Sequence, residues 1–188
     1  PQGSFFKHKY NPKYPERKLV NMEMKRTFLS VAICCCCESC VTLVGKQPLS
    51  KDSPSSIILT MVALFVWIDA HFYFSHRLLH VVPFLYRHVH KVHHESFNPD
   101  PWSGLSFHPL EAIIYFSSLL IACIVPIPRW AFWLHKIALL VAPANGHHGH
   151  KVPYLPSTFS SDHHYLHHVH FNCNYGSPTP FWDWAFGT

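Results

Sequence analysis

Four long apolar runs alternate with polar segments along the chain. They cover Phe28–Gly45, Ile57–Phe74, Leu110–Val125 and Trp130–Ala144. Glu38 and Asp69 are the charged residues that interrupt the first two runs. Each run is near or below the length of about 17 to 25 residues at which an apolar helix crosses a bilayer. The pattern predicts an all-α fold, a membrane bundle of about four transmembrane or re-entrant helices.

The polar segments between the runs predict how the helices connect. Pro126–Arg129 separates the last two runs and predicts a tight helical hairpin, which need not reach the far surface. Lys46–Ser56 contains prolines, serines and charges and predicts a loop. Residues 1–27 are polar and basic and contain three prolines, so we expect an extended tail there. We expect residues 28–188 to form a single domain.

The composition supports a membrane location. Charged residues make up 13% of the chain, about half the ~25% of ordinary soluble domains. The formal net charge is +5, and much of it lies in the N-terminal tail. The tail is interpreted either as a solvated basic segment or as a cytosolic flank facing anionic lipid. Nucleic-acid binding is not expected, because no basic stripe with interleaved aromatic residues accompanies this charge.

Histidine is the chain's most unusual feature. Eighteen of the 188 residues are histidine, and most lie in two windows, residues 71–108 and 147–170. A basic N-terminus favours the cytosolic side of a membrane. Two crossings by the first two runs, followed by a hairpin that leaves and returns, then place both windows on that side. The sequence therefore predicts a cytosolic histidine-rich helical cap at the membrane surface, where it would meet a lipid substrate.

Three histidine boxes have the spacing of metal ligands. His76 and His80 are four residues apart directly after the second run, so they stack on one helical face. The second box has histidines at relative positions one, four and five, which would share a helical face, and the third box repeats this spacing. These two boxes are His90, His93 and His94, then His164, His167 and His168. Imidazoles at this spacing can share a metal.

The number of histidines indicates two metals rather than one. With His147 the boxes supply nine candidate ligands, whereas one zinc needs four. His150 is a further candidate. Imidazole suits several metals, but a site beneath an apolar bundle suggests a lipid substrate. Oxidation of an inert C–H bond requires O₂ and a redox metal, which favours iron over zinc. The Cys34–Cys37 run lies among apolar residues and is expected to pack in a helix rather than bind metal.

Four further positions could support the metal site. Asp69, a carboxylate inside an apolar run, is expected to bond a ligand histidine or a nearby cation. His108 is expected to start the third helix, with Pro109 in its first turn, or to orient a ligand. His163 and His71 are interpreted either as groups that orient ligand rings or as plain surface residues.

The boxes and their surroundings resemble the fatty acid hydroxylase/sterol desaturase superfamily. The likeness covers roughly residues 60–188 and includes Glu95, the segment His108–Glu111 and the segment Phe171–Gly176. It implies a multi-pass enzyme of the endoplasmic-reticulum membrane that uses two irons, O₂ and electrons from NAD(P)H through a b-type cytochrome. The implied reaction is hydroxylation or desaturation of a sterol or fatty acyl chain. The short stretch from Pro153 to His163 departs from the family pattern.

Two alternatives to the enzyme remain at this stage. One is a non-catalytic membrane metal-binding protein, which polar groups along a path across the bundle would favour. The other is a degenerate family member, which the short stretch before His163 would favour.

Overall fold

The structure, a computed structural model, describes residues 8–45, 53–151 and 161–188. The described residues are mainly helical, and the β-structure among them is one isolated bridge between Lys9 and His150. In chain order the helices are α1 (Arg17–Val44), α2 (Pro54–Val81), α3 (Pro83–His88), η2 (His90–Glu95), η3 (Ser103–Leu105), α4 (Pro109–Phe116), η4 (Ser117–Leu120), α5 (Ile121–Ile124), α6 (Arg129–Gly146), α7 (Ser161–His170) and α8 (Phe181–Phe186). The predicted all-α fold is confirmed.

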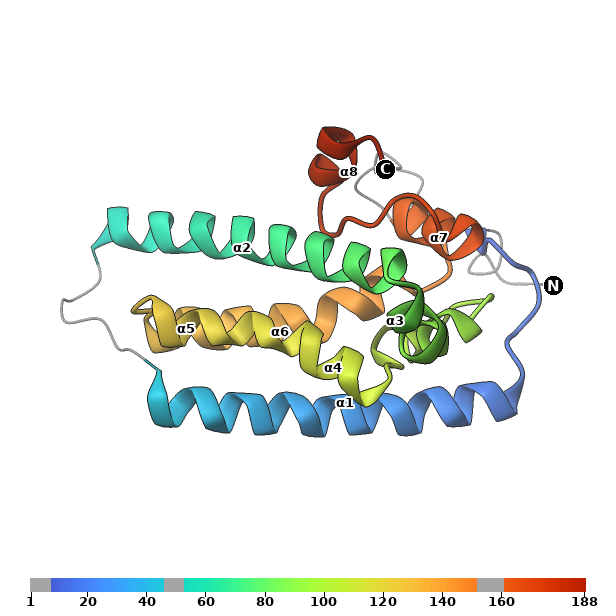
Figure 1. The fold of residues 1–188 in the computed structure, drawn as a ribbon, viewed down its shortest axis with the longest axis horizontal. Coiled ribbons are helices and arrows are strands. Elements are labelled where there is room, and N and C mark those ends of the chain that lie inside the picture. Colours follow the sequence, from blue (N-terminus) through green and yellow to red (C-terminus); the bar gives the residue numbers. More distant parts are fainter. Residues whose placement is uncertain (1–7, 46–52, 152–160) are drawn as a thin grey trace.

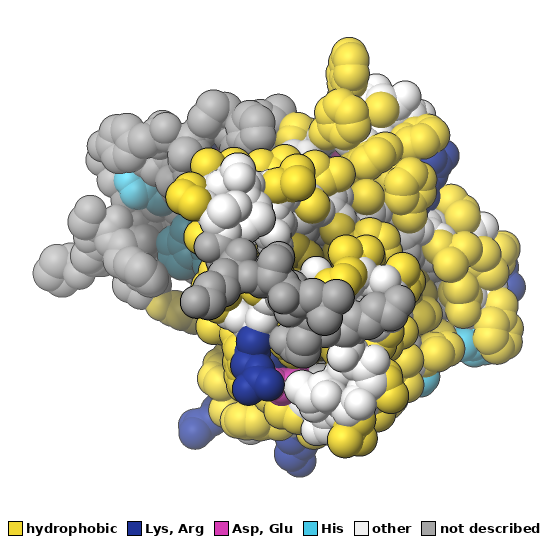
Figure 2. All heavy atoms as spheres, turned by 90° about the vertical axis from the view of Figure 1, so that its left-hand side faces the viewer, with side chains coloured by type: hydrophobic (Ala, Val, Ile, Leu, Met, Phe, Trp, Pro, Cys, Tyr) yellow, Lys and Arg dark blue, Asp and Glu magenta, His cyan; other side chains and the backbone are white. Residues whose placement is uncertain are grey.

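Two helices, α1 and α2, are long and apolar enough to cross a membrane among the described residues. Each has 28 residues, about 42 Å at 1.5 Å per residue. Only 22% and 17% of their most apolar windows are buried, so these helices are unlike the core helices of a soluble protein. Hydrophobic side chains dominate the end of the bundle seen in Figure 2. The outward apolar faces fit a lipid environment.

The start of α1 corrects one expectation. The helix begins at Arg17, so the extended conformation expected for residues 17–27 is wrong. Contacts with the distant cap hold this part of α1. Thr27 donates a hydrogen bond to the Trp102 carbonyl over 2.7 Å, and Arg26 pairs with Glu95 at 2.7 Å. The two residues of each contact are 69 and 75 positions apart in sequence, so a local sequence pattern could not reveal the contacts.

The predicted hairpin is present. The consecutive helices α4, η4 and α5 lead to a break, and α6 returns alongside them (Figure 1). The Tyr115 hydroxyl donates to the Leu139 carbonyl over 2.8 Å and links the two arms. Of the predicted loop Lys46–Ser56, residues 46–52 lie outside the described residues. The helix α2 begins at Pro54, where Ser53 and Ser56 form a capping box.

The histidine cap lies at one end of the bundle. Figure 1 shows α3 and α7 together near the C-terminal end of α2 and the N-terminal end of α1. At this end η3 packs against both α1 and α6. The helix α8 packs on α2 through stacked rings of Tyr73 and Phe186. Away from the cap, Cys34 is buried in the apolar core, as expected for a packing residue, whereas Cys35 and Cys36 are exposed.

Candidate metal centre

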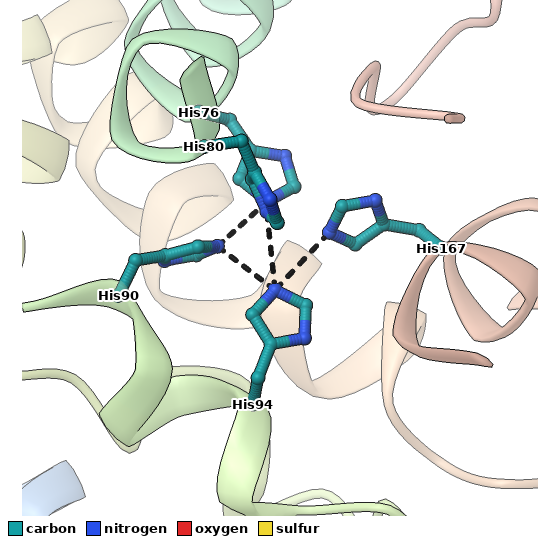
Figure 3. Close-up of side chains that lie close together, drawn as sticks. All are labelled: His76, His80, His90, His94 and His167. Atoms are coloured by element: carbon teal, nitrogen blue, oxygen red, sulfur yellow. Dashed lines mark hydrogen bonds between the residues drawn. The ribbon is translucent and has the colours of Figure 1, made fainter. Parts of the chain in front are cut away.

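The fold gathers nine histidines into two groups. In each group one possible ligand atom per residue lies within 4.8 Å of all the others. Group one is His76, His80, His90, His94 and His167 (Figure 3), and group two is His93, His147, His164 and His168. These are the nine ligands that the sequence predicts. His80 is half-buried, and the other eight are buried.

Neighbouring residues of the second and third boxes belong to different groups. His93 lies in group two and His94 in group one. The same division holds in α7, where His167 faces group one and His168 faces group two. The second box forms a 3₁₀-helix. The expectation that its three histidines share one face is wrong, because His90 and His94 lie in group one and His93 lies in group two. Both boxes therefore tie the two groups together.

The spacing of the ring nitrogens in group one fits a shared metal. The Nε2 atoms of His90 and His94 are 3.0 Å apart, and those of His76 and His90 are 3.2 Å apart. Two nitrogens bound at about 2.1 Å to one metal, at angles near 90° to 105°, lie roughly 3.0 to 3.3 Å apart. In Figure 3 the five rings point toward one another from α2, η2 and α7.

Proton positions indicate that these close contacts are not ordinary hydrogen bonds. The Nδ1 atom of His76 lies 2.8 Å from the Tyr175 carbonyl, which can only accept, so this nitrogen carries the proton. The Nδ1 atom of His167 likewise donates to the Cys173 carbonyl over 2.7 Å. Both Nε2 atoms then present lone pairs to the interior of group one. A cation between them would remove this repulsion, so the residues fit a metal.

Group two also brings Nε2 atoms too close together for ordinary hydrogen bonds to explain. The Nδ1 atom of His147 donates to the Pro143 carbonyl over 2.7 Å, which leaves a lone pair on Nε2. That single lone pair faces three other Nε2 atoms, those of His93, His164 and His168, at 3.0 to 3.2 Å. One lone pair cannot accept three hydrogen bonds, whereas one metal can bind four imidazoles.

Four ligand rings are oriented by acceptors that bind their remote nitrogen. The acceptors are the backbone carbonyls of Pro143, Cys173 and Tyr175 and the carboxylate of Glu111. Such partners fix the tautomer and raise the basicity of a ligand histidine. The sequence drew attention to Glu111 only as part of a family segment. An acidic residue at the start of an apolar run was the available signal.

Burial keeps the cap histidines neutral. It lowers the pKa of His147 to about 4 and that of His94 to about 2, with smaller contributions from neighbouring imidazoles. Burial also lowers the pKa of His93, His164 and His168 well below the usual value. Neutral imidazole is the form that binds a metal, so the groups need not lose protons at neutral pH.

The additional candidates lie outside both groups. Asp69 accepts hydrogen bonds from the backbone and hydroxyl of Thr179, so the expected bond to a ligand histidine or cation is wrong. His108 caps the N-terminus of α4 by accepting from the Leu110 amide, as predicted for a helix start. His150 contacts the His148 carbonyl through Nδ1 at 2.7 Å.

His163 supports group one through a chain of contacts. It pairs with Asp183 at 3.1 Å. Asp183 also accepts from the backbone amides of Tyr175 and Gly176. Because the Tyr175 carbonyl accepts from His76, this chain positions a group-one ring.

A cavity of about 230 Å³ lies between the apolar bundle and the histidine groups. Five of the grouped histidines border it, His76 and His90 from group one and His93, His147 and His164 from group two. Its other walls are mainly apolar and include Phe65, Ile68, Phe72, Leu79, Phe107, Ile114, Tyr115 and Leu139. A ligand in this cavity would therefore contact an apolar wall and rings from both groups.

Three proteins of named activity are similar to this chain in sequence. Rat (Rattus norvegicus) methylsterol monooxygenase 1 is 35% identical over 129 residues, which cover 64% of this chain and 43% of the relative. The very-long-chain aldehyde decarbonylase GL1-11 of Oryza sativa subsp. indica is 32% identical over 141 residues, 70% of this chain and 53% of its own. Delta(7)-sterol 5(6)-desaturase ERG3B of Gibberella zeae is 29% identical over 137 residues, which cover 70% of this chain and 41% of the relative.

The chain thus spans about half the length of the curated relatives that it matches. No solved structure matches it. The sequence profile of the fatty acid hydroxylase family matches residues 61–188, which contain all nine grouped histidines. The chain belongs to the fatty acid hydroxylase family.

Proposed function

We propose that this protein is a membrane non-haem di-iron oxygenase that hydroxylates or desaturates a lipid. The observation that carries the proposal is the cavity, whose apolar walls meet five histidine rings from both groups. Its volume is below the ~300 to 1,000 Å³ of typical small-molecule sites, so it would hold one end of a lipid. The names of the relatives, a sterol monooxygenase and a sterol desaturase, support a lipid substrate.

Group one would hold one iron and group two the other. Bound iron would supply O₂ activation and the oxidation of a C–H bond, which zinc cannot do because it has no redox chemistry. In hydroxylation the C–H bond becomes C–OH, while O₂ with two electrons and two protons yields that oxygen and one water. In desaturation the lipid loses two hydrogens, and the same inputs yield two waters. The cavity walls exclude water and position the carbon.

The electron source and membrane orientation complete the proposal. Electrons from NAD(P)H would arrive through a b-type cytochrome and its reductase. Arg17, Lys18 and Lys25 are exposed on α1 at the same end of the bundle as the cap (Figure 1). Positive charge favours the cytosolic side, so the cap would face the cytosol from the endoplasmic-reticulum membrane.

A non-catalytic metal carrier is less well supported. It would need polar groups free to line a path across the bundle. Glu38 instead pairs with Lys136 at 2.8 Å, and Asp69 holds Thr179. His135 bonds the hydroxyl of Ser118 at 3.0 Å. The segment behind the degenerate-member alternative, Pro153 to His163, lies mostly outside the described residues.

Product analysis tests the proposed function. The iron-loaded protein in lipid vesicles would receive NADH, reductase, a b-type cytochrome and candidate sterols or fatty acyl lipids. Mass spectrometry under ¹⁸O₂ should detect a lipid with one added ¹⁸O atom, or one that has lost two hydrogens. The matched control is His93→Ala, which should form none. Lack of an O₂-dependent product from iron-loaded protein with any of these lipids would contradict the proposal.

A further inference from the structure

One histidine of the cavity lining belongs to neither metal group. His71 lies on α2, five residues before His76, so it sits about 7.5 Å farther along the helix axis from the groups. Its ring lines the cavity, and the side chain is half-buried, with Phe65, Ile68 and Phe72 as neighbouring walls. Ionisable side chains inside a membrane bundle are costly, and those that face a cavity commonly serve function.

The contacts of His71 determine which of its nitrogens carries the proton. Its Nε2 atom lies 3.0 Å from the Ser117 hydroxyl oxygen. The Ser117 hydroxyl donates its hydrogen to the Ile114 carbonyl over 2.6 Å, so it can only accept from His71. Nε2 therefore carries the proton and Nδ1 carries a lone pair. No donor to this Nδ1 is found in the part of the chain that the structure describes.

Two other hydroxyls at the cavity, those of Ser75 and Tyr115, donate to backbone carbonyls. The Ser75 hydroxyl donates to the His71 carbonyl over 2.6 Å, and the Tyr115 hydroxyl donates to the Leu139 carbonyl over 2.8 Å. A ligand bound in the cavity can therefore supply the donor. A hydroxyl group on an otherwise apolar molecule satisfies both the lone pair and the walls.

We propose that His71 binds the hydroxyl group of a monohydroxylated lipid, such as a sterol, and so sets which carbon reaches the histidine groups. This inference rests on the proposed function for the identity of the reacting end. It favours a hydroxylated lipid over an unsubstituted acyl chain or an aldehyde. The hydroxyl and the oxidised carbon would be separated by no more than about 7.5 Å along α2.

His135 provides a matched control within the same bundle. Like His71, it bonds a serine hydroxyl of η4 at 3.0 Å, in this case Ser118. Unlike His71, it is fully buried and does not line the cavity. Loss of either histidine removes a similar internal hydrogen bond, but only loss of His71 removes an acceptor from the cavity.

Equilibrium binding to detergent-purified protein tests the proposal. The probes are a radiolabelled 4-methylsterol with its free hydroxyl and the methyl ether of the same sterol, which cannot donate. Wild type should bind the free sterol about tenfold more tightly, the effect of about one hydrogen bond to the ligand. His71→Leu should abolish this preference while binding the ether normally, and His71→Gln, whose amide can accept, should retain part of it. His135→Leu should retain the full preference.

Four results would overturn the proposal. They are equal binding of both probes by wild type, binding of neither probe, a preference that survives His71→Leu, and an equal loss of preference in His135→Leu. The product assay is independent of this binding assay. Preference without any oxidised product would refute the oxygenase and leave the hydroxyl site standing. Product formation without a preference for the free sterol would refute the hydroxyl site and leave the oxygenase standing. In the active enzyme His71→Leu should raise KM for the free sterol.

Discussion

The carboxylate of Glu111 should strengthen metal binding at group one. Its Oε1 atom accepts from His90 Nδ1 over 2.7 Å, and both side chains are nearly fully buried, at 4% and 1% exposure. Carboxylate partners of ligand histidines typically contribute a factor of 10 to 100 in metal affinity, about 1.4 to 2.8 kcal/mol. Glu111→Gln keeps an acceptor and loses the charge, so we expect a loss of about tenfold. Glu111→Ala loses both the acceptor and the charge, so we expect metal affinity to fall about a hundredfold.

Competition with a chromogenic chelator would measure the iron affinity of each variant. The matched control is Glu23→Gln. Glu23 is also a buried carboxylate beside η2, but it accepts from the hydroxyl of Ser96 rather than from a ligand ring. We expect this variant to stay within about twofold of wild type, because its bond does not orient a ligand. Equal affinity of Glu111→Ala and wild type would refute the reasoning.

Two further predictions concern the histidine groups. His167→Ala should deplete the iron of group one and His168→Ala that of group two, as Mössbauer spectra of the two adjacent variants would show; identical spectra would contradict the division. The metal-free protein should lose stability below about pH 6.5, because unfolded histidines bind protons there, whereas burial holds the pKa of His147 near 4 and that of His94 near 2. Each such ring lowers the free energy of unfolding by up to about 1.4 kcal/mol per pH unit. The melting temperature should therefore be lower at pH 5.5 than at pH 7.5, and an unchanged melting temperature would contradict this prediction.

Local spacing carried much of the sequence prediction. His76 and His80 are four residues apart on a continuous helix, so their shared face follows from helix geometry alone. The ligand number also followed, because the boxes and His147 supply more imidazoles than one metal needs. Hydropathy predicted the cores of α1 and α2, since each contains an apolar run of near-spanning length.

The failures involve contacts between residues far apart in sequence. Asp69 bonds Thr179, 110 residues away, and no local pattern links the two. Glu111 reaches His90 only because the hairpin packs beneath the cap. The division of His93 and His94 between groups depends on where η2, α2, α6 and α7 lie relative to one another in the folded chain. Periodicity describes one helix at a time, so it cannot supply such arrangements.

The central claim, two irons held by nine histidines, is tested most directly by elemental analysis of the detergent-purified protein after iron loading. The comparison is a double variant, His93→Ala/His167→Ala, which removes one ligand from each group. We predict about two irons per wild-type chain and a large loss in the variant, since the residues fit one metal in each group. One metal per chain, or iron content that does not depend on these two histidines, would contradict the di-iron centre.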